Sequence, residues 1–251
     1  WGTTQKILFY PERKRIMRII EVESYEKLSA LAADIIGAQV LLKPDCVLGL
    51  ATGSSPLGTY SNLVKRYEAG LLDFSRVRTV NLDEYCGLKG DDPQSYRYFM
   101  DTNLFNKVNV KKENTNLPDG SAGDMEAESE RYEALVEALG WPDLQLLGIG
   151  QNGHIGFNEP EDTFPTKVHT VKLTESTIKA NSRLFDKPED VPTHAITMGI
   201  GAIMKAKRVL LIAGADKAEI VERAFRGPVT PQVPASILQL HRDATVIFSR
   251  A

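Results

Sequence analysis

Residues 46–67 read "CVLGLATGSSPLGTYSNLVKRY", and this stretch contains the unit that decides the fold. Cys46–Ala51 is a short apolar run, as expected of a strand buried on both faces of a parallel sheet. Glycine and serine then interrupt the run, and Pro56–Tyr67 carries apolar residues at helical spacing. A strand that passes through a tight turn into a helix is a βα unit, so the stretch predicts a parallel sheet covered by helices.

The same alternation recurs along the 251 residues. It predicts an α/β fold with a mostly parallel central sheet, in a single domain over residues 17–251. We expect residues 1–16 to be a leader or a remnant of cloning. Further strands are expected at Arg18–Glu21, Arg78–Leu82, Leu144–Ile149, Val168–Leu173, His194–Met198, Val209–Ala213 and Ala244–Phe248, and further helices at Ser24–Val40, Gln94–Phe105, Asp124–Leu139 and Lys217–Phe225.

The composition favours a globular protein that handles small ligands. Hydrophobic residues make up 42% and charged residues 25%, with a formal net charge of −3, so nothing attracts nucleic acid or anionic lipid. The apolar runs are far shorter than the roughly 20 residues that a membrane helix needs. Two cysteines are too few for a disulfide framework. We therefore expect a cytoplasmic protein with no membrane or nucleic-acid partner.

The turn after Cys46–Ala51 has the features of a phosphate site. Ligands of open parallel sheets bind where the strands end. Gly53 suits a tight turn, Ser54 and Ser55 can cap the next helix, and Pro56 suits its first turn. Free amides and the hydroxyls of Thr52, Ser54 and Ser55 at a helix start favour an anion. The alternative is a helix cap with no ligand.

Two other strand ends carry charged side chains. Asp83 and Glu84 follow Arg78–Leu82, and partial burial would make one of them a general base. The alternative is a pair of solvated loop acids. Lys217 lies in the first turn of a helix, where a cation needs an anionic partner. Arg183 is a possible second anion contact, although an arginine on a helix surface usually contacts only solvent.

Residues 148–160 read "GIGQNGHIGFNEP", in which Gly148, Gly150 and Gly153 fit the GxGxxG dinucleotide fingerprint. That fingerprint requires a helix to start on the glycines, but another glycine and prolines follow here, so we interpret the match as accidental. The glycines instead permit close approach of a ligand, while His154 offers a side chain that titrates near neutrality. Glu159 is placed to orient it. The four histidines lack metal-ligand spacing, so no metal is expected.

Together these loops resemble the glucosamine-6-phosphate deaminase family. The resemblance runs from about Met17 to the C-terminus and is carried, in the family's order, by "LGLATGSSPLGTY", "VNLDEYCGL", "SYRYFM", "GIGQNGHIGFNEP", "ANSRLF" and "LQLH". It implies a three-layer α/β/α, modified Rossmann-like fold. It also implies an enzyme that converts glucosamine 6-phosphate and water into fructose 6-phosphate and ammonia without a cofactor.

The resemblance implies a role for each matching residue. Asp83 matches the base that moves a proton between C2 and C1 of the open-chain sugar, His154 the acid-base group of ring opening, and Glu159 its carboxylate helper. Gly148 and Gly150 would bring backbone groups against the sugar. The phosphate-binding set is matched by Thr52, Gly53, Ser54, Ser55, Arg183 and Lys217.

Two departures from the family pattern affect these expectations. Many members have Asp where this chain has Asn152, and Asn cannot balance the charge of an imidazolium. Some members are hexamers activated by N-acetylglucosamine 6-phosphate through an arginine and a lysine, and His169 and Val171 stand at those positions here. We therefore expect no such activation, and the sequence leaves the oligomeric state open.

Two rival functions remain at this stage. A 6-phosphogluconolactonase would need a phosphate site and a base but no carbon-acid chemistry, and the combination of "LDEY" with "GHIGFNEP" argues against it. A sugar-phosphate sensor domain of a transcriptional regulator would normally add a basic DNA-binding module. Only the first sixteen residues are available for one, which is too few for a helix-turn-helix.

Overall fold

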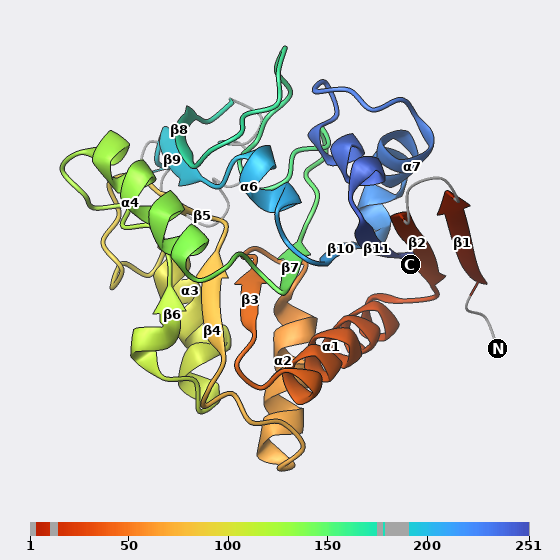
Figure 1. Ribbon diagram of the computed structural model, residues 1–251, viewed down its shortest axis with the longest axis horizontal. Helices are drawn as coiled ribbons and strands as arrows, with labels where there is room; N and C mark the ends of the chain where they lie inside the picture. The colour runs from red at the N-terminus through yellow and green to blue at the C-terminus, as the bar shows by residue number, and fades with distance from the viewer. Residues whose placement is uncertain (1–3, 11–14, 175–177, 179–190, 251) are drawn as a thin grey trace.

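A computed structural model of the chain describes residues 4–10, 15–174, 178 and 191–250 (Figure 1). Its main feature is an eight-stranded sheet with the order β1-β2-β11-β10-β7-β3-β4-β6. All neighbours are parallel except β1 and β2. The strands are β1 (Thr4–Tyr10), β2 (Arg15–Val22), β3 (Val47–Leu50), β4 (Arg78–Asn81), β6 (Thr115–Asn116), β7 (Leu144–Leu147), β10 (Val209–Ala213) and β11 (Asp243–Ser249).

Helices flank this sheet (Figure 1), and their ends follow local sequence signals. Ser24 caps α1 by accepting from the Lys27 amide, and Asp124 caps α4 by accepting from the Glu126 amide at 3.0 Å. The helices are α1 (Tyr25–Leu42), α2 (Leu57–Glu68), α3 (Tyr96–Asn103), α4 (Met125–Ala138), α6 (Ile200–Met204) and α7 (Ala218–Arg226), with 3₁₀ turns η1 (Phe105–Lys107), η2 (Lys112–Asn114), η5 (Ala215–Lys217) and η6 (Pro234–Leu240).

The predicted α/β class and mostly parallel central sheet are confirmed. Strands β3, β7 and β10 are buried over their whole length, because helices cover both of their faces and leave no exposed side to be polar. None of the helices in the described ranges is long and apolar enough to cross a membrane.

Two predicted strands do not belong to the parallel sheet. β8 (His169–Lys172) and β9 (His194–Thr197) pair antiparallel in a second sheet, and β9 also pairs antiparallel with β5 (Asp83–Tyr85). Their apolar runs revealed strands but not partners, since partners depend on contacts far along the chain. This small sheet continues from β4, and the Met198 amide of the segment after β9 donates to the Leu82 carbonyl at 2.7 Å.

Part of the predicted leader is an element of the sheet. Residues Thr4–Tyr10 form β1, which pairs with β2 in register from Thr4 opposite Glu21 to Tyr10 opposite Arg15. β1 thus extends the sheet at the edge next to β2. This pairing does not test where residues 1–16 come from, and that part of the expectation stays a prediction.

Candidate active site

Four neighbouring strands of the central sheet end in the loops that the sequence singles out. The strands are β10, β7, β3 and β4, and the segments that follow them carry Lys217, His154, Thr52 and Asp83 respectively. Because parallel neighbours end at the same edge, all four segments start from one rim (Figure 1). The small sheet with β5 lies over this edge.

Asp83 is the first residue of β5, and its side chain is almost fully buried. A Cβ atom added to Gly156 would lie 3.5 Å from the Asp83 Oδ2, so the loop that carries His154 passes directly against this carboxyl group. Burial, with a further contribution from the negative charge of Glu84, raises the pKa of Asp83 to about 8. A carboxylate with such a pKa is a stronger base than a solvated one.

The His154 ring lies against the backbone of Gly150. A Cβ atom on residue 150 would overlap three ring atoms, so this position needs a glycine. The ring Nδ1 is 3.6 Å from the Glu159 Oε2, and the side chains of His154 and Glu159 are 23% and 4% exposed. A buried acid therefore stands behind an imidazole that is partly open to solvent, which suits proton exchange with a ligand.

Asn152 connects these two groups. Its Nδ2 donates to the Glu159 Oε2, and its Oδ1 accepts from the His154 amide at 3.2 Å. The amide thus aims the glutamate by hydrogen bonding and carries no charge of its own. An aspartate here could accept from the His154 amide but could not donate to Glu159 while ionised.

No helix follows the glycines of this loop. Residues 151–160 form turns and a single isolated bridge between Ile155 and Asn158. The interpretation of the GxGxxG match as accidental is therefore confirmed, because no helix N-terminus faces a pyrophosphate here.

The turn after β3 leaves backbone amides open, while the carbonyl groups of Ser54 and Ser55 accept from the Tyr25 hydroxyl. Gly53 has a φ of 90°, which is the left-handed conformation that glycine tolerates. Within the described residues, nothing accepts from the backbone amides of Gly53, Ser54 or Ser55. The predicted capping of α2 by Ser54 or Ser55 is wrong: Pro56 is the N-cap and no side chain caps the helix. Both serine hydroxyls are consequently left for a ligand.

Lys217 lies in η5 and immediately precedes α7. Its Nζ is 2.9 Å from the Asp216 Oδ2, and its side chain is 18% exposed. The anionic partner that a cation needs at this position is thus Asp216 in the described residues, and contact of Lys217 with a substrate anion stays a prediction. Gln151, in the loop of His154, donates to the same carboxylate at 3.3 Å and ties the two loops together. Arg183 lies outside the described residues.

Gly148, by contrast with Gly150, faces open space, since a Cβ atom there would meet nothing within 4 Å. This leaves room for a ligand against its backbone. Among the described residues, no group of three or more His, Cys, Asp or Glu side chains could hold a metal ion.

Tyr96, the first residue of α3, is not among the site residues predicted from the sequence. Its hydroxyl interacts with the side chains of Tyr85 and Thr52, and its pKa is raised first by burial and then by the charges of Tyr85 and Asp83. Tyr96 therefore lies between the anion turn and the buried carboxyl group. Its ring stacks on that of Phe157, with 6.0 Å between centroids. The motif "SYRYFM" marks this segment, but no periodicity distinguishes Tyr96 from its neighbours.

With this geometry established, comparison with known proteins identifies the family. The sequence model described as glucosamine-6-phosphate isomerases/6-phosphogluconolactonase matches residues 22–247. The chain belongs to this family. It is 61% identical over 232 residues to a glucosamine-6-phosphate deaminase of Lachnoclostridium phytofermentans, covering 92% of this chain and 98% of that one. It is also 53% identical over 236 residues to a glucosamine-6-phosphate deaminase of Clostridioides difficile, covering 94% and 95%.

Solved structures of family members share the fold. A protein described as a monomeric glucosamine-6-phosphate deaminase matches with a TM-score of 0.90 and 48% identity, over 92% of this chain and 97% of that one. A 6-phosphogluconolactonase from Thermotoga maritima matches with a TM-score of 0.72 but only 20% identity, over 93% and 99% of the two chains. The second likeness concerns the architecture alone.

Proposed function

We propose that this protein converts glucosamine 6-phosphate and water into fructose 6-phosphate and ammonia. The observation that carries the proposal is the buried Asp83 carboxyl group, whose pKa is raised to about 8 and which lies against the loop of His154. Relatives with this activity in their names share more than half of the sequence over more than nine-tenths of its length. We place the reaction in the cytoplasm, where free thiols such as Cys46 and Cys86 persist.

The phosphate binds at the turn after β3. The unpartnered amides of Gly53, Ser54 and Ser55 supply donors for an anion, and the hydroxyls of Ser54 and Ser55 supply more. Thr52 lies beside them, with its side chain also in contact with Tyr96. Lys217 contributes a positive charge from the segment after β10 on the same rim, and Arg183 completes the predicted set. Binding energy gained at the phosphate holds the reacting carbons in register, because it is made far from the bonds that change.

His154 and Glu159 open the sugar ring. The imidazole passes a proton to the ring oxygen while the C1 hydroxyl loses one, so the pyranose becomes an aldehyde with no net change in protons. Glu159 stabilises the imidazolium form from 3.6 Å. The neighbouring backbone of Gly148 faces open space where the sugar would lie.

Asp83 then moves the proton between the two carbons. Its carboxylate removes the C2 proton, which the adjacent aldehyde has made acidic, while the C2 ammonium group passes a proton to the C1 oxygen, to give an enolamine. Asp83 then returns the C2 proton to C1, which leaves a protonated imine at C2. Water adds to that imine and ammonia departs, which yields fructose 6-phosphate. One buried carboxyl group of raised pKa serves as the base and then as the acid.

The test is ammonia release from glucosamine 6-phosphate by wild type and by Asp83→Asn. The variant keeps the shape of the side chain but cannot take a proton from carbon, so we expect turnover to fall by roughly 10³-fold or more. Binding of glucitol 6-phosphate, an open-chain alcohol that cannot isomerise, should remain. Asp91→Asn, at an exposed position, is the matched control. An Asp83→Asn enzyme that still released ammonia at the wild-type rate would contradict the proposal.

The family description also includes 6-phosphogluconolactonases, and the same preparation distinguishes that activity. A lactonase must activate water against an ester but need not remove a proton from carbon. Hydrolysis of 6-phosphogluconolactone without ammonia release from the amino sugar would assign the chain to that branch. Sugar-phosphate binding with neither activity would instead support a sensor.

We further propose that N-acetylglucosamine 6-phosphate does not activate this enzyme. Val171 lies on β8 and is buried in the small hydrophobic cluster with Tyr85 and Phe157. No cationic side chain is available at that position, and His169 replaces the arginine of the activated members. Substrate saturation should be hyperbolic with and without the acetylated sugar phosphate. A sigmoidal curve that the acetylated sugar made hyperbolic would reject this.

A further inference from the structure

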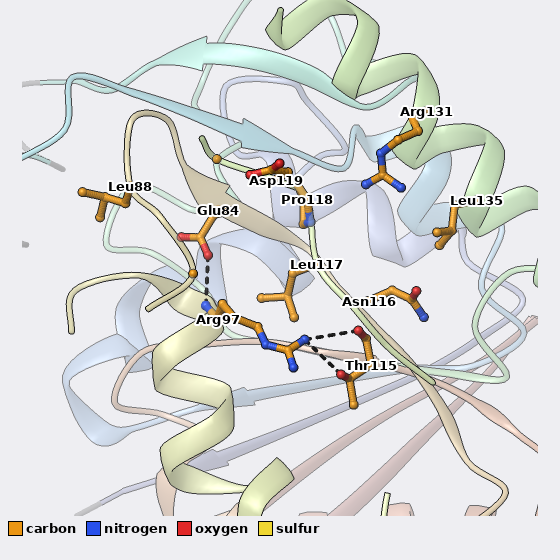
Figure 2. A pocket seen from close by; sticks show the side chains of 12 residues that line it. Glu84, Leu88, Arg97, Thr115, Asn116, Leu117, Pro118, Asp119, Arg131 and Leu135 are labelled. Carbon is orange, nitrogen blue, oxygen red and sulfur yellow. Dashed lines mark hydrogen bonds between the residues drawn. The ribbon is translucent and has the colours of Figure 1, made fainter. Parts of the chain in front are cut away.

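Behind the strand that carries the proposed base lies a pocket of about 240 Å³ (Figure 2). It is lined by residues of β5, α3, β6 and α4, among them Glu84, Arg97 and Arg131. Successive residues of a strand point to opposite sides, so Glu84 points into this cavity while Asp83 faces the His154 loop. The proposed reaction does not use Glu84, yet this residue is only 1% exposed.

The Glu84 carboxylate is fully engaged by backbone amides. Its Oε1 accepts from the amides of Tyr85 at 2.9 Å and Tyr96 at 2.8 Å, and its Oε2 accepts from the amide of Arg97 at 2.9 Å. Figure 2 shows the contact with Arg97. The next amide of α3 is satisfied by the Ser95 hydroxyl. Glu84 therefore takes the first two amides of α3, which a helix leaves without internal partners.

The first turn of α3 carries the side chain that reaches the active site. The Tyr96 amide donates to Glu84, and the Tyr96 hydroxyl interacts with the side chains of Tyr85 and of Thr52, which lies in the turn after β3. Its ring is held between Tyr85, at a centroid distance of 4.8 Å, and Phe157, which follows the loop of His154. Tyr96 thus contacts three parts of the site: β5, which carries Asp83, the turn after β3, and the loop that carries His154.

We propose that Glu84 is a positioning residue, which fastens the first turn of α3 to β5 and thereby holds the Tyr96 hydroxyl on the phosphate-binding turn beside Asp83. The inference rests on the proposed function and adds to it a link between phosphate binding and the base. Glu84 contacts no substrate in this scheme. Glu84 acts through Tyr96, so substitution of either residue should weaken phosphate binding.

The charge of Glu84 has a second measurable effect, which is on the pKa of Asp83. It raises the pKa of Asp83, after burial as the larger cause. The titratable groups close enough to Asp83 for their charges to interact with it are Glu84 and Tyr85 on its own strand, Tyr96 of α3 and Tyr132 of α4. The charged and titratable groups around Glu84 itself are Asp92 in the segment before α3, Arg97 of α3, Cys86 after β5, Asp119 in the loop after β6 and Arg131 of α4. Loss of the Glu84 charge should lower the pKa of Asp83.

A double-mutant cycle on the full chain tests the proposal, with Glu84→Gln, Tyr96→Phe and the combined variant. Gln keeps the volume but replaces one acceptor oxygen with an NH₂ group, which faces an amide donor and loosens the turn. Phe removes only the hydroxyl. For each protein we would measure Kd for glucitol 6-phosphate and for inorganic phosphate, kcat and KM for ammonia release, and the pH profile of kcat/KM. Controls are Glu130→Gln, exposed on α4, and Tyr98→Phe, whose residue is 42% exposed on α3.

The link predicts that each single variant weakens glucitol 6-phosphate binding by roughly 10-fold, and that the double variant is no weaker than the worse single one. The acidic limb of the kcat/KM pH profile should move to lower pH in Glu84→Gln. The corresponding shift in Tyr96→Phe should be smaller, because that variant keeps the Glu84 charge. Additive losses, or a Tyr96→Phe enzyme with wild-type affinity, would overturn the link. Because wild-type ammonia release is measured in the same series, failure of the proposed function is seen separately. If Glu84→Gln does not fold, Tyr96→Phe beside Tyr98→Phe still decides the matter.

Discussion

Replacement of Gly150 by alanine should damage catalysis far more than folding. The backbone φ of Gly150 is outside the left-handed range in which glycine is needed, so alanine brings no backbone strain. The cost arises from the added methyl group, because it would occupy the space of the His154 Cε1, Nε2 and Nδ1 atoms. The imidazole must therefore leave its place beside Glu159.

The displacement can be worked out from the contact. Ordinary van der Waals contact begins at 3.4 Å, and the added Cβ atom falls roughly 1 Å inside that limit. A shift of about 1 Å in a catalytic group costs roughly 100-fold in rate. Overpacking usually costs about 1–3 kcal/mol, and the low end applies here because the ring can move toward solvent. For a chain of this length, about 1 kcal/mol lowers Tm by roughly 2–4 °C.

Steady-state ammonia release and thermal unfolding measure the two effects on one preparation. Gly123→Ala is the matched control, because a Cβ atom at that position, unlike one at Gly150, meets nothing within 4 Å, and the backbone φ is not positive at either glycine. We expect Gly150→Ala to lose kcat while its Tm stays within a few degrees of that of the control. A kcat equal to that of wild type would refute the placement of His154 as the ring-opening group.

Three further outcomes follow from the same geometry. Burial raises the pKa of Asp83 from 3.8 to about 8, so its ionisation opposes folding: stability is intact below about pH 4 and is lost as pH rises through 8. Asp83→Asn should therefore gain Tm progressively from pH 4 to 8, and a Tm difference that does not change with pH would contradict the burial argument. Asn152→Asp places an anion beside the imidazolium of His154 and opposite Glu159, so the acidic limb of the pH–rate profile should move to higher pH; superimposable limbs for the two proteins would exclude this role. Gly148→Ala should raise KM for glucosamine 6-phosphate with Tm unchanged, since the added methyl group meets only open space, and an unaltered KM would remove Gly148 from the substrate site.

The sequence predicts the core of the fold well because its signals are local. The run at 209–213 is apolar throughout and becomes β10, buried at every position, and the helix start at Asp124 is marked by its own capping side chain. Strands 169–172 and 194–197 were also predicted, but their sheet was not, because hydrophobic periodicity identifies a strand and not its neighbour. β5 was missed since three residues, two of them acidic, show no period.

The candidate site likewise has features that the sequence predicts and features that only the structure shows. The order of apolar runs and polar turns along the chain determines that Thr52, Asp83, His154 and Lys217 follow strands, and the family motifs attach roles to them. Only the tertiary structure decides that Asp83 is buried and that Glu84, one residue later, points into a different cavity. Only the folded chain brings Tyr96 to Thr52. Solvation, charge neighbours and hydrogen bonds between distant segments arise from packing in three dimensions, and a linear pattern of residue types does not contain them.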